Sequence, residues 1–338
     1  MANNKNQHFV PQAYLKAFGN GRAIDIFNLV NGGIRNAPIK GQCSKDYFYG
    51  EDLVVEKQLS QFEGEFISKI RDLGSSGYRP TTQDFSLFAR FWLLQHLRTD
   101  AEVRRVTSMQ EKMVEGASNS DEWTMPFREI TKMCVRIATT APETLIDDLK
   151  YCILVNKTDI PFVTSDDPAI HTNRLYLTRR GKFLLSPGVG SSGAILILPL
   201  NPRLCFLAFD PDTYTVDERN GFVNLKKSRD ALAINQHQYL NCDSNIYFSD
   251  WKFLEKVKLH FASVSVNRRE RITMNEGEIA DKELIHFGNV LLEPTLWPSI
   301  LRNRFKQTGY SNGSAAGFIR KARFNSAPEY GDFKKITF

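Results

Sequence analysis

The chain has 338 residues, of which 42% are apolar and 24% charged, and a formal net charge of +6. These proportions are typical of a globular protein with a sizeable core, and they exclude a chain that is mostly disordered. The polar first residues lack a secretory signal, no apolar run is long enough to span a bilayer, and the five cysteines are scattered. We therefore expect a cytoplasmic protein that binds no membrane.

The first half of the chain predicts one hairpin followed by helices. Residues 23–36 alternate apolar and polar side chains and contain Asn31-Gly32-Gly33, a turn sequence typical of a β-hairpin. Apolar residues spaced by three and four positions predict a helix around residues 59–70 and a second helix that begins at Thr81 or Thr82 and runs to Met113. A third helix is expected over residues 125–140.

The second half of the chain is richer in residues that favour β-structure. Short β-rich runs occupy residues 151–155, 161–164, 195–198 and 204–209. The first two runs predict a hairpin that leads into Ser165-Asp166-Asp167-Pro168, and the other two predict a further pair of strands. A helix is expected over residues 225–240.

The domain organisation follows from the absence of any internal repeat or linker in the sequence. We expect residues 1–299 to form a single composite domain of the α+β class. Its helical N-terminal half would be joined to a small mixed or antiparallel sheet with further helices.

Residues 300–338 form a predicted C-terminal tail with eight basic and two acidic side chains, which accounts for the whole net charge. Aromatic residues alternate with these charges, as they do in proteins that bind nucleic acids. The tail therefore predicts RNA or DNA as a partner, and the alternative is a solvated tail whose aromatic side chains dock on the core. The proposed substrate-binding residues are Arg302, Arg304, Arg320 and Lys321.

Several motifs together resemble one bacterial family. Residues 7–18 read Gln-His-Phe-Val-Pro-Gln-Ala-Tyr-Leu-Lys-Ala-Phe, residues 95–98 read Gln-His-Leu-Arg, and residues 162–168 read Phe-Val-Thr-Ser-Asp-Asp-Pro. In order and spacing they resemble the family known as domain of unknown function 4238, over about residues 7–249. The resemblance implies no agreed activity.

Four polar residues within these blocks and the first helix are candidate catalytic residues. His8 lies in an extended segment before Pro11, where it could act as a general base, a metal ligand or a hydrogen-bond anchor. Gln95 and Arg98, three residues apart, share one polar face of an apolar helix. They could hold a phosphate or carboxylate, or Arg98 could pair with Glu63 inside the fold.

Asp166 and Asp167 are candidate metal ligands because they follow a β-run and precede Pro168. Adjacent carboxylates repel each other, so burying both requires a cation, a metal ion or a shared proton. One interpretation is a pair that binds Mg²⁺ or Mn²⁺. The other is that Asp166 caps the turn while Asp167 is solvated.

The leading hypothesis from these residues is a metal-dependent nuclease, acting in bacterial defence or as a toxin, with Arg98 neutralising the phosphate. A non-catalytic binding module, in which the same polar residues form a structural network, is the alternative. A third possibility is a metal-independent helical ribonuclease that uses Arg90 and His96, although six-residue spacing places them on different helix faces. The sequence contains no phosphate-binding loop, dinucleotide fingerprint or Gly-x-Ser-x-Gly turn.

Overall fold

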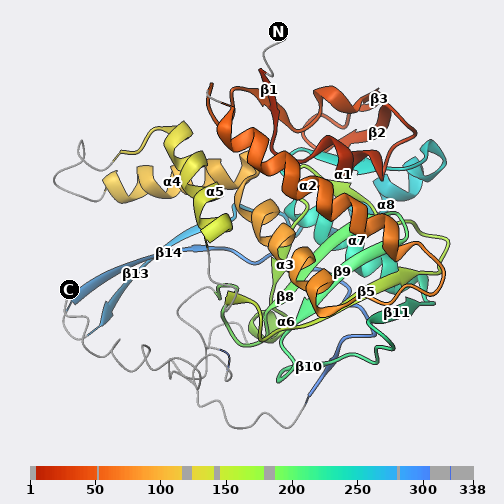
Figure 1. Ribbon diagram of the computed structural model, residues 1–338. Helices are drawn as coiled ribbons and strands as arrows, with labels where there is room; N and C mark the ends of the chain where they lie inside the picture. Colours follow the sequence, from red (N-terminus) through yellow and green to blue (C-terminus); the bar gives the residue numbers. More distant parts are fainter. Residues whose placement is uncertain are drawn as a thin grey trace.

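The computed structural model shows a protein of the α+β class, with most of its long helices in the N-terminal half (Figure 1). This arrangement confirms the fold class expected from the sequence. The residues that it describes are 5–51, 53–115, 124–140, 145–178, 187–279, 282–304 and 320.

The N-terminal segment combines short strands with a hairpin. It contains β1 (Asn6–His8), α1 (Gln12–Lys16), β2 (Ala23–Asn28), β3 (Ile34–Pro38), η1 (Ile39–Gly41) and β4 (Ser44–Asp46). β1 pairs with β4, and β2 pairs with β3, both in antiparallel fashion. The predicted hairpin is therefore confirmed. Asn31 accepts a hydrogen bond from the Gly33 backbone at 2.7 Å, and Gly32 takes the positive φ of 66° that its turn requires.

Four helices follow: α2 (Val54–Leu73), α3 (Thr82–Leu97), α4 (Asp100–Glu115) and α5 (Phe127–Thr140). Thr81 caps α3 through a reciprocal capping box with Asp84. The prediction of a single helix as far as Met113 is wrong, because the helix is interrupted between α3 and α4. At the break the Thr99 hydroxyl accepts the backbone N–H of Glu102 at 3.2 Å and so caps a new helix.

A five-stranded sheet forms the centre of the molecule. Its strand order is β11 (Phe222–Leu225), β5 (Lys150–Asn156), β9 (Leu204–Phe209), β8 (Ile195–Asn201) and β7 (Ile170–Thr172). β11 and β5 are parallel, and the other neighbours are antiparallel, which confirms the predicted pair of strands at β8 and β9.

Both faces of this sheet are buried, because side chains alternate between two cores. On one face, Leu198 and Phe206 join the same core as Trp92 of α3. On the other face, Leu207 joins the same core as Ile234 of α7 (Ser228–Asn241). Figure 1 shows the sheet between α3 and α7. The run of buried residues in β8 follows from this position.

The hairpin predicted between residues 151–155 and 161–164 is wrong. Instead, β6 (Thr164–Ser165) pairs with β12 (Asn245–Phe248), in a second sheet of order β3-β2-β12-β6. The side chain of Asn156 closes the intervening loop, donating to the Ile160 carbonyl at 2.7 Å and accepting the Thr158 N–H at 3.0 Å. These local bonds turn the chain away from the first sheet.

α7 lies between the two sheets and is buried along most of its length. The second sheet packs against α7 and α8 in a separate core that contains Ile246, Tyr239 and Val257. The remaining elements are α6 (Arg174–Thr178), β10 (Tyr214–Thr215), η3 (Trp251–Phe253), α8 (Leu254–Ser265), β13 (Ile272–Ile279), β14 (Lys282–Asn289) and β15 (Arg302–Asn303).

The start of the predicted tail belongs to the folded body, since β15 pairs with β10 and Leu301 is buried in the core. Arg320 is described as well, whereas residues 305–319 and 321–338 lie outside the described part. Among the described helices, none combines the length and the apolar character needed to cross a bilayer.

Candidate functional site

Three of the predicted catalytic residues form one cluster, namely Glu63, Gln95 and Arg98. The guanidinium of Arg98 is fully buried. Its Nη1 donates to Glu63 Oε1 at 2.7 Å, while Nε and Nη2 donate to Gln95 Oε1 at 3.3 and 3.2 Å. Gln95 also donates through Nε2 to the Phe9 carbonyl at 2.8 Å. This Arg98 cluster therefore ties α2 and α3 to the N-terminal segment.

His8 lies beside the Arg98 cluster but uses its ring to anchor the chain. His8 Nε2 is 3.1 Å from the Lys40 carbonyl, and the Tyr49 hydroxyl donates to the His8 carbonyl at 3.2 Å. Burial lowers the pKa of His8, and the nearby positive charge of Arg98 lowers it further. A neutral ring that donates to a carbonyl fits the role of hydrogen-bond anchor.

The electrostatics of the Arg98 cluster are those of a balanced internal network. Burial would lower the pKa of Arg98, but Glu63 and Tyr49 outweigh it, so that its pKa is raised. Glu56 lies one heptad before Glu63, and burial together with the Glu63 charge raises its pKa to about 7. The guanidinium thus pairs with Glu63, while the nearby Glu56 takes up a proton more readily than an ordinary glutamate.

α7 positions the segment that carries the two predicted metal ligands. Asn235 accepts the Val163 N–H at 3.0 Å and donates to the Pro161 carbonyl at 2.8 Å. Gln238 accepts from the Ser165 hydroxyl at 2.7 Å and donates to the Pro168 carbonyl at 2.8 Å. Both sides of the Asp166-Asp167 pair are therefore held to one helix.

Asp166 accepts three backbone hydrogen bonds from a single turn. The N–H groups of Asp243, Ser244 and Asn245 each donate to its carboxylate at 2.8 Å. Burial raises the pKa of Asp166 to about 7, with a contribution from the Asp243 charge, while these donors oppose the rise. This geometry matches the interpretation that Asp166 caps a turn.

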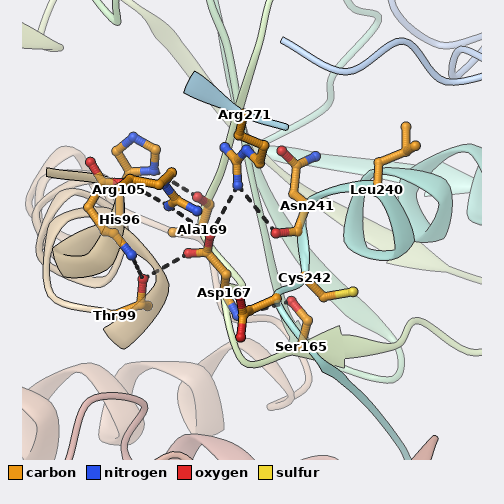
Figure 2. Close-up of polar contacts among 12 residues, drawn as sticks. His96, Thr99, Arg105, Ser165, Asp167, Ala169, Leu240, Asn241, Cys242 and Arg271 are labelled. Carbon is orange, nitrogen blue, oxygen red and sulfur yellow. Dashed lines mark hydrogen bonds and ion pairs between the residues drawn. The ribbon is translucent and has the colours of Figure 1, made fainter. Parts of the chain in front are cut away.

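Asp167 is buried between two arginines, so the interpretation in which it is solvated is wrong (Figure 2). Arg105 Nη2 donates to Asp167 Oδ2 at 2.8 Å, Arg271 Nη1 donates to the same oxygen at 3.1 Å, and the Thr99 hydroxyl donates to Oδ1 at 3.0 Å. Burial alone would raise the pKa of Asp167, but Arg105 and Arg271 outweigh it and hold the pKa below its ordinary value.

The cation that the paired carboxylates require is thus supplied, at least for Asp167, by guanidinium groups. Asp166 and Asp167 bind different partners. The described residues contain no group of three or more His, Cys, Asp or Glu side chains placed to hold a metal ion. The assignment of Mg²⁺ or Mn²⁺ to this pair stays a prediction.

A cavity of about 270 Å³ opens beside Asp167 and Arg271. Its walls are α4, the end of α7 with the turn that Asp166 caps, and the chain that leads into β13. We call it the arginine cavity because five of the residues that line it are Arg104, Arg105, Arg268, Arg269 and Arg271. Two carboxylates, Asp243 and Glu270, also line it.

The arginines of this cavity differ in what they bind. Arg268 holds backbone carbonyls of the turn after α7, including those of Tyr239 at 2.6 Å and Cys242 at 3.1 Å. In contrast, the buried Nε of Arg271 has no hydrogen-bond partner, and Arg269 makes no ion pair with any described residue. Burial and the neighbouring Arg105 lower the pKa of Arg271 to about 10. The cavity therefore retains donors suited to an anion.

Arg90 and His96 do not form a shared site. Arg90 is exposed, whereas His96 is buried, stacks on Trp92 and has Nδ1 2.9 Å from the Ala169 carbonyl. Burial lowers the pKa of His96. The two side chains lie on different sides of α3, as their six-residue spacing predicts.

The four tail residues proposed to bind nucleic acid differ in their exposure to solvent. Arg302 and Arg304 are exposed, and Lys321 lies outside the described residues. Arg320 is buried, which contradicts its proposed role. Its Nε and Nη2 donate to Asp148 at 2.6 and 2.7 Å, so its charge is already neutralised inside the protein.

Sequence reasoning missed Arg105 and Arg271, the two partners of Asp167. One signal was available, because the repulsion between adjacent aspartates requires a cation nearby. The Arg268-Arg269-Glu270-Arg271 run and the Arg104-Arg105 pair are among the densest basic segments in the described body. Their convergence depends on how α4 and α8 pack, which no local pattern reveals.

Comparison with known proteins identifies a family to which the chain is similar. The family model described as "Protein of unknown function (DUF4238)" matches residues 6–252, which is more than two thirds of the chain. No curated protein and no solved structure matches the chain. The matched region contains the Arg98 cluster and Asp166-Asp167, but it ends before Arg268 and Arg271.

Proposed function

The chain belongs to the DUF4238 family, and from that premise we propose that it binds a phosphate-bearing ligand in the arginine cavity. The observation that carries the proposal is the state of Arg271. Arg271 lines the cavity and is half-buried, its buried Nε lacks a partner, and its pKa is lowered to about 10. An anion bound in the cavity would give this guanidinium a second negatively charged partner beside Asp167.

The type of cation favours phosphate over other anions. A guanidinium donates through several N–H groups in one plane and matches the oxygens of a phosphate, and it stays charged at all physiological pH values. Asp167, which does not line the cavity, fixes the orientation of Arg105 and Arg271 through ion pairs. The two arginines are thus held in place before the ligand arrives, which reduces the entropy lost on binding.

The size of the cavity favours a terminal phosphate. Its volume of about 270 Å³ lies just below the range of roughly 300–1,000 Å³ that is usual for small-molecule sites. A phosphomonoester group would enter it, while the rest of a nucleotide or polynucleotide would lie outside. Arg104 and Arg269 at the cavity could contact the following phosphates.

Hydrolysis of the ligand goes beyond this proposal. In the predicted nuclease, His8, Glu63, Gln95 and Arg98 would act on the phosphate, but these side chains bind one another or the backbone around Arg98. None of these four lines the arginine cavity. The geometry thus favours the binding module over the nuclease among the functions that the sequence suggested.

Fluorescence anisotropy with short labelled RNA and DNA oligonucleotides tests the proposal. We expect a 5′-phosphorylated oligonucleotide to bind more tightly than its 5′-hydroxyl counterpart, and binding to weaken as salt is added. Arg269→Met and Arg271→Lys should each reduce the preference for the 5′-phosphate. The matched control is Arg22→Met, because Arg22 is exposed and lies outside the cavity.

Equal binding of phosphorylated and hydroxyl oligonucleotides, or variants that behave like Arg22→Met, would refute the proposal. The same mixtures with added Mg²⁺ or Mn²⁺ test the nuclease prediction. Cleavage that a chelator abolishes would show that the protein is also a metal-dependent nuclease. Oligonucleotides that stay intact would show that it binds them without cleaving them. Cleavage that persists in chelator would instead support the metal-independent ribonuclease.

A further inference from the structure

A second cavity, of about 590 Å³, lies between α2, α3 and α5 and shares no lining residue with the arginine cavity. Ile146 and Tyr151, at the start of the central sheet, line another side. Its volume falls within the range of roughly 300–1,000 Å³ found for small-molecule sites. Neither Arg98 nor Asp167 lines it, so the roles proposed for those residues leave it unexplained.

The floor of this helical cavity is apolar. Ala89, Leu93 and Leu94 of α3 and Val135 and Ala138 of α5 line it, and all five are buried. Two of them are alanines, whose small side chains leave space that larger residues would fill. An apolar surface of this kind gains free energy when an apolar group displaces water from it. The floor therefore selects an apolar ligand body.

The mouth of the helical cavity is positively charged. Arg90, Lys132 and Arg136 line it, with Asp147 as its one carboxylate. Lys132 pairs with Glu129 at 3.1 Å, whereas Arg136 is exposed and makes no ion pair with any residue in the described part of the chain. A cation next to an apolar floor selects a ligand with a negative charge at one end.

We propose that the helical cavity binds an amphipathic anion, namely an acyl chain that ends in a carboxylate. The chain would lie on the floor formed by α3 and α5, and the carboxylate would accept hydrogen bonds from Arg136 at the mouth. A nucleotide fits poorly, because its polar body would lose hydrogen bonds to water without finding partners on these walls. This site is independent of the phosphate proposed for the arginine cavity.

Isothermal titration calorimetry with dodecanoate and its uncharged analogue dodecanol tests this proposal. We expect dodecanoate to bind more tightly than dodecanol. Arg136→Gln should weaken dodecanoate binding about tenfold, because it removes a hydrogen bond to a charged group, and leave dodecanol binding unchanged. Arg22→Gln, which removes an exposed arginine that does not line the cavity, should change neither affinity.

A second variant, Ala138→Phe, fills the cavity instead of changing its charge. It should weaken the binding of both ligands, and thermal melting shows whether the variant is folded. If it is not folded, the Arg136→Gln comparison decides alone, because that exposed side chain is not part of the core. Absence of dodecanoate binding, or binding that Arg136→Gln leaves unchanged, would overturn the proposal. Added pyrophosphate should not displace dodecanoate, since the two cavities are separate.

Discussion

The Arg98 cluster and the arginine cavity each contain an arginine paired with a carboxylate, yet they differ in whether every nitrogen of that arginine has a hydrogen-bond partner. All three nitrogens of Arg98 have partners, in Glu63 and Gln95. Arg271 also pairs with a carboxylate, but its Nε has no partner and it lines a cavity. A buried charge is therefore weak evidence for a ligand site, whereas a donor left over at a cavity is stronger evidence.

The largest expected effect is the loss of stability when Arg98 is removed. Arg98→Met would leave Glu63 and Gln95 without their partner in the interior, and breaking a buried ion pair in this way costs about 3–5 kcal/mol. Urea unfolding measures this change. The control is Lys258→Met, which breaks an exposed pair with Glu255 and should cost no more than about 1 kcal/mol. Similar values for both variants would contradict a structural role for Arg98.

His237 tests whether an unpartnered buried group is enough to identify a site. Both of its ring nitrogens lack hydrogen-bond partners, and it lines neither cavity. Burial lowers its pKa to about 3, so the folded state keeps the ring neutral while the unfolded state takes up a proton below its ordinary pKa of about 6.5. The stability that this difference provides is present above pH 6.5 and is lost as the pH falls towards 3.

His237→Phe should therefore flatten the acid limb of the stability profile. At pH 5 the loss attributable to a ring with these two pKa values is about 2 kcal/mol, and the variant lacks this loss. The measurement is the difference between the free energies of unfolding at pH 7 and pH 5, compared in the two proteins. If the difference is the same in both, His237 is not held neutral by burial.

Glu56 gives a smaller effect of opposite sign within the Arg98 cluster. Its pKa in the folded state is raised to about 7, above the ordinary value of 4.5. The folded state therefore holds the proton more tightly, and stability falls as the pH rises from 4.5 to 7. Glu56→Gln removes this fall. Because Glu56 is partly exposed, we expect a gain of about 1 kcal/mol relative to the native chain at pH 8, measured by urea unfolding.

The parts of the fold that the sequence predicted correctly are those with local signals. The turn at Asn31-Gly32-Gly33 and the capping residue Thr81 were identified from a few neighbouring residues. The break at Thr99 was missed, because its hydroxyl must both cap α4 and bond to Asp167 from a distant segment. The predicted hairpin at residues 161–164 failed for a related reason, since β6 finds its partner in β12, some eighty residues later.

The residues of the candidate site also fall into those with a local sequence signal and those that depend on long-range contacts. Helix spacing predicted that Gln95 and Arg98 share one polar face, because side chains three or four residues apart do so. The pairing of Arg98 with Glu63 was one of two roles that this face left open. The arginines around Asp167 come from α4 and from the chain after α8, and they meet only in the folded chain, where both bind Asp167. Sequence spacing contains no information on contacts of this range.

The most direct test of the phosphate site is the change in Tm on adding inorganic pyrophosphate, with ionic strength held constant by NaCl. A ligand that binds the folded state alone raises Tm. We expect the native chain and the control Arg22→Met to gain equally, as should Arg98→Met from its lower starting Tm, whereas Arg269→Met and Arg271→Lys gain much less. A gain that is the same in all five proteins, or no gain in the native chain, would contradict the account.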